Sequence, residues 1–194
     1  MIERIGFMQG RLSPVMDGKI QSFPWDTWKE EIVSAKNIGL SVMEWTLDQE
    51  GLDRNPLMTP DGQLTINELC KKHNFSIPSL TGDCFMQAPF WKSVDKHSSK
   101  KLKADFTSIL ESCNQVGIKL VVVPLVDGGR LENMNQENIL VEFLLELKNK
   151  LTHLDLKVIF ESDFKPVELK RFMSRLDRNS FGINYDTGNS AALG

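Results

Sequence analysis

Short apolar runs alternate along the chain with longer segments in which apolar residues recur every three or four positions. The short runs predict β-strands and the longer segments predict amphipathic helices, because these spacings place side chains on one face of each element. The predicted strands are Arg4–Gln9, Leu40–Trp45, Phe75–Leu80, Lys119–Val126, Leu156–Phe160 and Phe181–Tyr185. The predicted helices are Trp25–Ile38, Pro60–His73, Ser98–Val116, Gln136–Leu154 and Pro166–Leu176.

Repeated strand–helix units that end in a further strand are typical of parallel sheets with right-handed crossovers. Two architectures fit: an open doubly wound sheet, and a (β/α)8 barrel that is incomplete, with about six strands and five helices. A dinucleotide-binding sheet would have a GxGxxG turn after its first strand, and Gly6, Gly10 and Gly18 do not form one. We therefore expect an α/β fold of the (β/α)8 TIM-barrel type, as a single partial domain over residues 1–194. A complete barrel usually needs about 250 residues.

Composition narrows the classes of partner. The formal net charge is −3, and the lysines and arginines form no basic stripe, which argues against nucleic-acid binding. The apolar runs are far shorter than the roughly 20 residues that cross a bilayer, so no membrane partner is expected. The N-terminus has no signal-peptide pattern, and the 3 cysteines are widely spaced, as is typical of reduced thiols in a cytoplasmic protein.

Polar side chains stand where the predicted strands end. Glu161 and Asp186 follow two consecutive strands, whose carboxyl ends lie on the same side of a parallel sheet. Two carboxylates placed in this way are half of a metal site, and their oxygens suit Mg²⁺ or Mn²⁺, or Zn²⁺ if histidines join them. Gln9, Glu44 and Asp83 end three other strands or follow them closely, so they are candidate substrate-binding groups.

Some strand-end groups have a structural alternative. Asp163 precedes Lys165 and Pro166, and capping of the next helix is its favoured role. Asp127 precedes two glycines, so a turn and a site remain equal alternatives. The aromatic residues near the strand ends are expected mostly in the core, although they are also suited to wall a sugar-sized pocket: Trp45, Phe85, Phe90 and Trp91.

Four segments together resemble the xylose-isomerase-like barrels, and more narrowly the sugar phosphate isomerase/epimerase group. They are Ile5–Ser13, Val42–Trp45, Phe160–Ser162 and Asn184–Asn189. The resemblance covers the whole chain and implies a (β/α)8 barrel with one divalent metal at its mouth. It implies that Glu161 and Asp186 are metal ligands and that Asn189 contacts substrate, at a position where some relatives have a histidine. The ligands after strands seven and eight have no counterpart.

The activity that the resemblance implies is metal-dependent isomerisation or epimerisation of a sugar or sugar phosphate. Glu161 would remove the proton next to the carbonyl group and an enediolate would form. Because strands seven and eight are missing, activity is expected to be impaired. The alternative is a non-catalytic remnant barrel that serves as a binding or assembly module, and its exposed sheet edges would favour a homo-oligomer.

Overall fold

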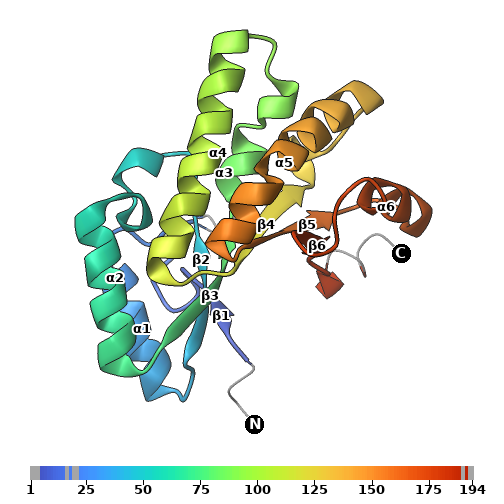
Figure 1. Cartoon of the computed structure of the whole chain (residues 1–194). Helices are drawn as coiled ribbons and strands as arrows, with labels where there is room; N and C mark the ends of the chain where they lie inside the picture. Colours follow the sequence, from blue (N-terminus) through green and yellow to red (C-terminus); the bar gives the residue numbers. More distant parts are fainter. Residues whose placement is uncertain (1–4, 16–17, 19–21, 189–190, 192–194) are drawn as a thin grey trace.

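The computed structural model describes residues 5–15, 18, 22–188 and 191. Its strands form one sheet in which order along the chain and order in space are the same, and every neighbouring pair is parallel (Figure 1). The strands are β1 Phe7–Met8, β2 Val42–Thr46, β3 Ser76–Thr81, β4 Leu120–Leu125, β5 Lys157–Ser162 and β6 Phe181–Ile183. This arrangement confirms the predicted α/β fold with parallel strands. The predicted first strand is shortened to two residues, and Arg4 lies outside the described residues.

Each of the five predicted helices is present. They are α1 Trp28–Asn37, α2 Pro60–His73, α4 Lys96–Val116, α5 Met134–Leu154 and α6 Pro166–Met173. The prediction for α2 is correct at both ends. Residues at its start carry clear signals for the beginning of a helix. The side chain of Thr59 accepts a hydrogen bond from the backbone N–H of Gly62, and Pro60 occupies the first helical position.

A further helix, α3 Asp83–Gln87, was not predicted. It lies between the predicted strand Phe75–Leu80 and the predicted helix Ser98–Val116, where no regular element was expected. Five residues are too few to show a helical period in the sequence, and the neighbouring apolar residues Cys84 and Phe85 are both buried. Single turns of 3-10 helix also interrupt the long connections, at Leu52–Arg54, Pro56–Met58, Phe90–Lys92 and Asp127–Gly129.

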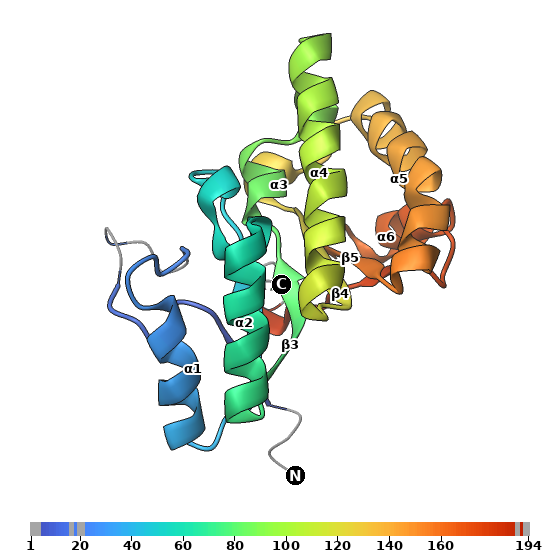
Figure 2. The ribbon, with the colours of Figure 1, turned by 60° about the vertical axis from the view of Figure 1, so that its left-hand side comes forward.

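The long helices cover one face of the sheet. Along the chain, α1 lies next to α2, α2 next to α4 and α4 next to α5 (Figure 2). The rings of Trp45 on β2 and Trp28 on α1 are 5.7 Å apart, and those of Phe160 on β5 and Phe172 on α6 are 5.1 Å apart. Since side chains alternate along a strand, the residues next to Trp45 and Phe160 face away from the helices.

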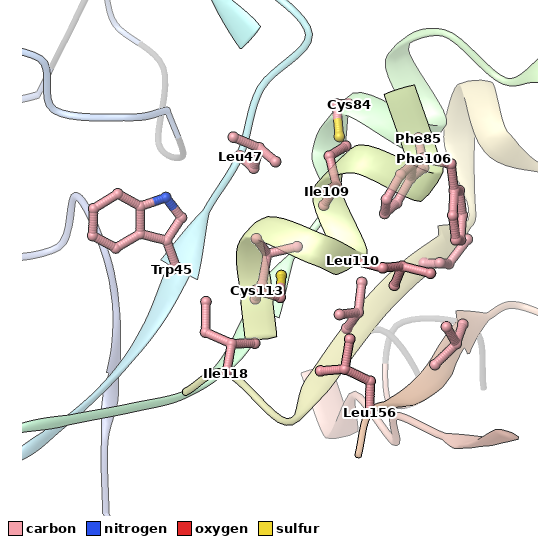
Figure 3. Close-up of a cluster of buried hydrophobic side chains, with 14 of the residues drawn as sticks. Trp45, Leu47, Cys84, Phe85, Phe106, Ile109, Leu110, Cys113, Ile118 and Leu156 are labelled. Carbon is pink, nitrogen blue, oxygen red and sulfur yellow. The ribbon is translucent and has the colours of Figure 1, made fainter. Parts of the chain in front are cut away.

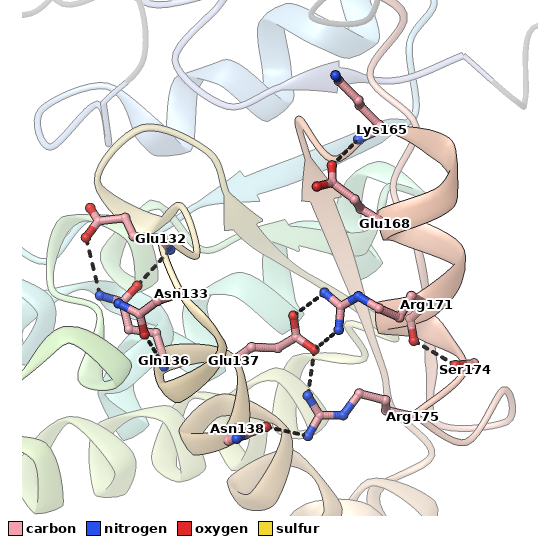
Figure 4. Close-up of polar contacts among 10 residues, drawn as sticks. All are labelled: Glu132, Asn133, Gln136, Glu137, Asn138, Lys165, Glu168, Arg171, Ser174 and Arg175. Atoms are coloured by element: carbon pink, nitrogen blue, oxygen red, sulfur yellow. Dashed lines mark hydrogen bonds and ion pairs between the residues drawn. The ribbon is translucent and has the colours of Figure 1, made fainter.

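The core between the sheet and the helices is aromatic and aliphatic (Figure 3). Phe85 and Phe106 pack with their ring centroids 4.3 Å apart. Trp45, Phe90 and Trp91 are buried with them, so these residues belong to the core and do not wall an open pocket. Farther along the chain, an ion-pair network fastens α6 to α5 (Figure 4). None of the described helices is both long and apolar enough to span a membrane.

Candidate functional site

The strand register shows where polar groups lie on the face away from the helices. One row of paired residues runs across the sheet from β2 to β6: Thr46, Thr81, Val122, Ile159 and Gly182. Glu161 pairs with Pro124 one step nearer the carboxyl ends of the strands. Glu44 pairs with Ser79 one step farther from them. Glu161 therefore lies at the mouth of the open barrel, and Glu44 lies deeper.

Glu161 is half-buried at the end of β5. The side-chain amide of Asn184 donates a hydrogen bond of 3.4 Å to Oε2 of Glu161. Asn184 follows β6 directly and belongs to the segment Asn184–Asn189 that carries the family resemblance, but the sequence analysis assigned it no role of its own. Its spacing was a usable signal, because a residue two positions before Asp186 falls on the same side of an extended chain.

Asp186 is half-buried and lines a groove of about 920 Å³ between α6 and β6. Glu161 is not among the described residues that line this groove. Glu161 lies near the end of β5, whereas Asp186 lies in the segment that follows β6. In the described part of the chain, no three His, Cys, Asp or Glu side chains gather into a group that could hold a metal ion.

Glu44 and Gln9 belong to a hydrogen-bonded set deeper in the sheet. The hydroxyl of Thr81 donates a short hydrogen bond to Glu44. Oε1 of Gln9 accepts from the backbone N–H of Thr46 at 3.1 Å, which extends the ladder between β1 and β2 by one step. Gln9 is fully buried, and its Nε2 has no hydrogen-bond partner among the described residues. Nε2 is the one donor in this set that a ligand or a water molecule could still satisfy.

Asp83 is the first residue of α3 and is only 4% exposed, so its side chain is not open to solvent. Burial raises the pKa of the adjacent Cys84 thiol well above its ordinary value, and the negative charges of Asp83 and Asp48 raise it further. Asn189, the remaining predicted substrate-binding residue, lies outside the described residues.

Glu31 of α1 is a residue of the barrel mouth that the sequence-based prediction missed. Its carboxylate accepts hydrogen bonds from the backbone N–H groups of Gly10, at 2.9 and 3.0 Å, and of Leu12, at 3.0 Å. It therefore shapes the loop that follows β1. Burial raises the pKa of Glu31, while these hydrogen bonds act in the opposite direction. The signal was its spacing, because Glu31 stands on the same helical face as Trp28 and Ala35.

Asp163 and Asp127 were each given a structural role as an alternative to a role in the site, and the structure shows the contacts or conformation of both. Asp163 forms an ion pair with Arg130. The first turn of α6 is instead capped by Glu168, whose carboxylate accepts from the backbone N–H of Lys165 at 3.1 Å, so the capping role predicted for Asp163 is wrong. Asp127 begins a 3-10 turn and has a φ of 45°, in agreement with the turn alternative.

Comparison with known proteins gives a family match and a set of similar folds. A family described as "Xylose isomerase-like TIM barrel" matches residues 32–194. None of the curated proteins compared with the chain is a match. Among solved structures, a xylose isomerase-like TIM barrel protein from Mycobacterium smegmatis, in complex with magnesium, is 16% identical with a TM-score of 0.66, over 95% of this chain and 64% of that one.

Two further similar structures are of proteins whose names describe an enzyme activity. The 3-keto-D-glucoside 4-epimerase from E. coli is 14% identical with a TM-score of 0.65, over 97% of this chain and 72% of that one. A sugar phosphate isomerase/epimerase from Parabacteroides distasonis is 11% identical with a TM-score of 0.65, over 97% of this chain and 67% of that one. The chain thus spans about two thirds of the length of these proteins, and at this identity the likeness shows a partial TIM-barrel fold.

Proposed function

Because the chain belongs to the xylose isomerase-like TIM barrel family, we propose that it carries part of a site for metal-dependent isomerisation or epimerisation of a sugar or sugar phosphate. The observation that carries the proposal is the position of Glu161. It ends β5 on the face away from the helices, next to the amide of Asn184. Catalytic groups of TIM-barrel enzymes stand at this end of the strands.

Glu161 and Asp186 would hold the divalent ion. Carboxylate oxygens suit Mg²⁺ or Mn²⁺, and Zn²⁺ is the third candidate. The magnesium in the similar Mycobacterium smegmatis protein supports this assignment. A bound divalent ion polarises the carbonyl and hydroxyl oxygens of a sugar. Two carboxylates fit the chemistry of such an ion but leave most of its coordination positions to water or to residues outside those described.

Glu161 would also act as the general base. Its carboxylate would accept the proton next to the substrate carbonyl and hold it until the proton is returned. The side-chain amide of Asn184 donates a hydrogen bond to Oε2 of Glu161, which would orient the carboxylate.

The remaining groups would bind the substrate. Glu44 with the Thr81 hydroxyl offers acceptors and donors for sugar hydroxyls below the mouth, and Nε2 of Gln9 offers a buried donor. Asp83 and Asn189 keep their predicted substrate-binding roles. For Asp83, which is buried, this role would require α3 to move.

The test is calorimetric titration of the chain with Mn²⁺. Wild type is expected to bind weakly, and Glu161→Gln and Asp186→Asn are each expected to weaken binding about tenfold or more, which corresponds to about 1.4 kcal/mol. Asp61→Asn, at an exposed position in the first turn of α2, is the matched control and should bind as wild type does. Equal binding by all four proteins would refute the assignment.

A second candidate function is a non-catalytic binding or assembly module. The observation that favours it is that, among the described residues, no three His, Cys, Asp or Glu side chains gather into a group that could hold a metal ion. Mn²⁺ binding that depends on Glu161, together with no turnover of D-tagatose or D-fructose, would favour this module over the enzyme. Turnover that is lost in Glu161→Gln would favour the enzyme.

A further inference from the structure

The N-terminal part of α4 lines an open hollow of about 350 Å³. Ser93 and Val94, in the connection before the helix, also line it. Figure 2 shows that this end of α4 projects beyond α2, so α2 does not cover it. None of the described residues that line the hollow is a candidate site residue or lines the groove beside Asp186. The hollow is therefore built from a separate set of side chains.

Three lysines of α4 line the hollow: Lys96, Lys100 and Lys103. Their spacing of four and three residues places them on one face of the helix. The ammonium group of Lys103 lies 5.4 Å from the ring centroid of Phe90 and 5.2 Å from that of Phe143. These cation–π contacts hold one of the positive charges at the hollow.

None of these three lysines forms an ion pair with a residue that the structure describes. Two neighbouring lysines that do not line the hollow are paired. Lys92 pairs with Glu132 at 2.6 Å, and Lys101 pairs with Asp105 at 2.9 Å. The first turn of α4 contains no acidic residue, and the carboxylate of Asp95 accepts hydrogen bonds from backbone N–H groups of the helix. The positive charge at the hollow is therefore not balanced by these nearby carboxylates.

This arrangement is electrostatically unfavourable without an anion. Like charges three and four residues apart on a helix repel each other, and the N-terminal end of a helix disfavours positive charge. The chain as a whole has a net charge of −3, so a local excess of positive charge is not a general property of its surface. We propose that the hollow binds a small phosphate-bearing anion, to which Lys96, Lys100 and Lys103 donate hydrogen bonds.

The size and chemistry of the hollow favour a phosphate group on a small molecule. Its volume is at the lower end of the range of about 300–1,000 Å³ for small-molecule sites. Ammonium groups bind phosphate as point charges, whereas the guanidinium fork of arginine matches a planar carboxylate, and none of the described lining residues is an arginine. The hydroxyls of Ser93 and Ser99 already donate to backbone carbonyl groups, at 3.1 and 3.5 Å, so the lysines would supply most of the affinity.

Calorimetric titration with pyrophosphate, at low ionic strength and without divalent metal, tests the proposal. We expect one binding site per chain and an affinity that falls as salt is added. Lys96→Gln combined with Lys100→Gln should weaken binding about tenfold or more, because two charged donors are lost. The control is Lys71→Gln combined with Lys72→Gln, at exposed positions on α2, which changes the net charge equally and should bind as wild type does. Circular dichroism verifies that both variants stay folded.

The proposal does not rest on the proposed function, so Glu161→Gln should bind pyrophosphate as wild type does. A loss of binding in that variant would place the anion at the barrel mouth and overturn the proposal. Absence of binding by wild type, or unchanged binding by the variant with Lys96 and Lys100 replaced, would do the same. An equal loss in the control variant would mean that net charge alone attracts the anion. Equal affinity for citrate, a carboxylate anion of similar charge, would overturn phosphate as the recognised group.

Discussion

Glu137 of α5 accepts two hydrogen bonds of 2.6 Å from the guanidinium group of Arg171 of α6 (Figure 4). Arg175, which follows the C-terminal end of α6, donates a third bond of 2.6 Å to the same carboxylate. Glu137 is only 2% exposed, whereas the arginine side chains remain 45% and 30% exposed. The ion pair between Glu137 and Arg171 holds α6 against α5, and α6 forms one wall of the groove that Asp186 lines.

Glu137→Gln is expected to destabilise the fold by about 2–3 kcal/mol, because breaking a buried ion pair costs about 3–5 kcal/mol and the partly exposed arginines recover some hydration. The measurement is urea unfolding at neutral pH. Glu146→Gln, at an exposed position on the same helix, is the control and should change stability little. A variant as stable as wild type would show that the ion pair does not hold α6.

Acid should remove the contribution that the ion pair between Glu137 and Arg171 makes to the free energy of unfolding. Hydrogen bonds from Arg171 hold the pKa of Glu137 below its ordinary value of 4.5, although burial opposes them. A lowered folded-state pKa stabilises the fold above the unfolded pKa, and this stability is lost as the pH falls through the folded-state value. The difference in unfolding free energy between wild type and Glu137→Gln should therefore shrink from pH 7 toward pH 3. A constant difference would contradict the pKa direction.

Much of the fold could be predicted because its elements are marked locally. The hydroxyl of Thr59, the ring of Pro60 and an apolar stripe define α2 without any help from tertiary contacts. The run Leu120–Val126 is apolar, and β4 is buried on both faces beyond its first residue. By contrast, α3 is short and its helical conformation accompanies the burial of Cys84 and Phe85, so no periodic pattern marks it.

The candidate site could be predicted only in part. Strand ends can be located from the sequence, and this is why Glu161 was placed correctly at the end of β5. The surroundings of a strand-end group depend on tertiary contacts, so the groove beside Asp186 and the burial of Asp83 had no local signal. A glutamate on a helix is usually solvated, so the spacing of Glu31 from Trp28 and Ala35 was its only sequence signal, and its hydrogen-bond partners in the loop after β1 could be identified only from the fold.

Glu31→Ala is expected to cost about 2–3 kcal/mol, because the backbone N–H groups of Gly10 and Leu12 would lose their acceptor. Glu31→Gln keeps one acceptor oxygen and should cost less. Urea unfolding of the two variants measures the difference. Equal losses would mean that side-chain volume, and not the hydrogen bonds, holds the loop.

The pH dependence of Glu31 has the opposite sign to that of Glu137. Burial raises the pKa of Glu31 above 4.5, so its ionised form is disfavoured in the fold. Wild type should therefore gain stability relative to Glu31→Gln as the pH falls through the raised folded-state pKa, and the gain should be complete below the unfolded value. Unfolding free energies measured between pH 4 and pH 8 test this, and a loss over that range would contradict it.

The thiols should react slowly while the chain is folded. Burial raises the pKa of Cys70 to about 11 and also raises the pKa values of Cys84 and Cys113 well above the ordinary value of a thiol. Because the thiolate is the reactive form, a disulfide reagent at pH 8 should modify at most Cys70 in the native state and all 3 cysteines in guanidinium. Cys70→Ser should abolish native-state labelling. Fast native labelling of that variant would show that Cys84 or Cys113 is accessible.

Gly62→Ala tests the contact between α2 and the preceding 3-10 turn. A Cβ atom at Gly62 would lie 2.5 and 2.6 Å from the backbone Cα and C atoms of Pro56, and closer still to its carbonyl oxygen. Alanine usually stabilises a helix by about 1 kcal/mol relative to glycine. Here the overlap with backbone should reverse the sign and cost about 1–3 kcal/mol. Leu64→Ala, exposed on the same helix, is the control in thermal and urea unfolding, and a Gly62→Ala variant that is more stable than wild type would refute this packing.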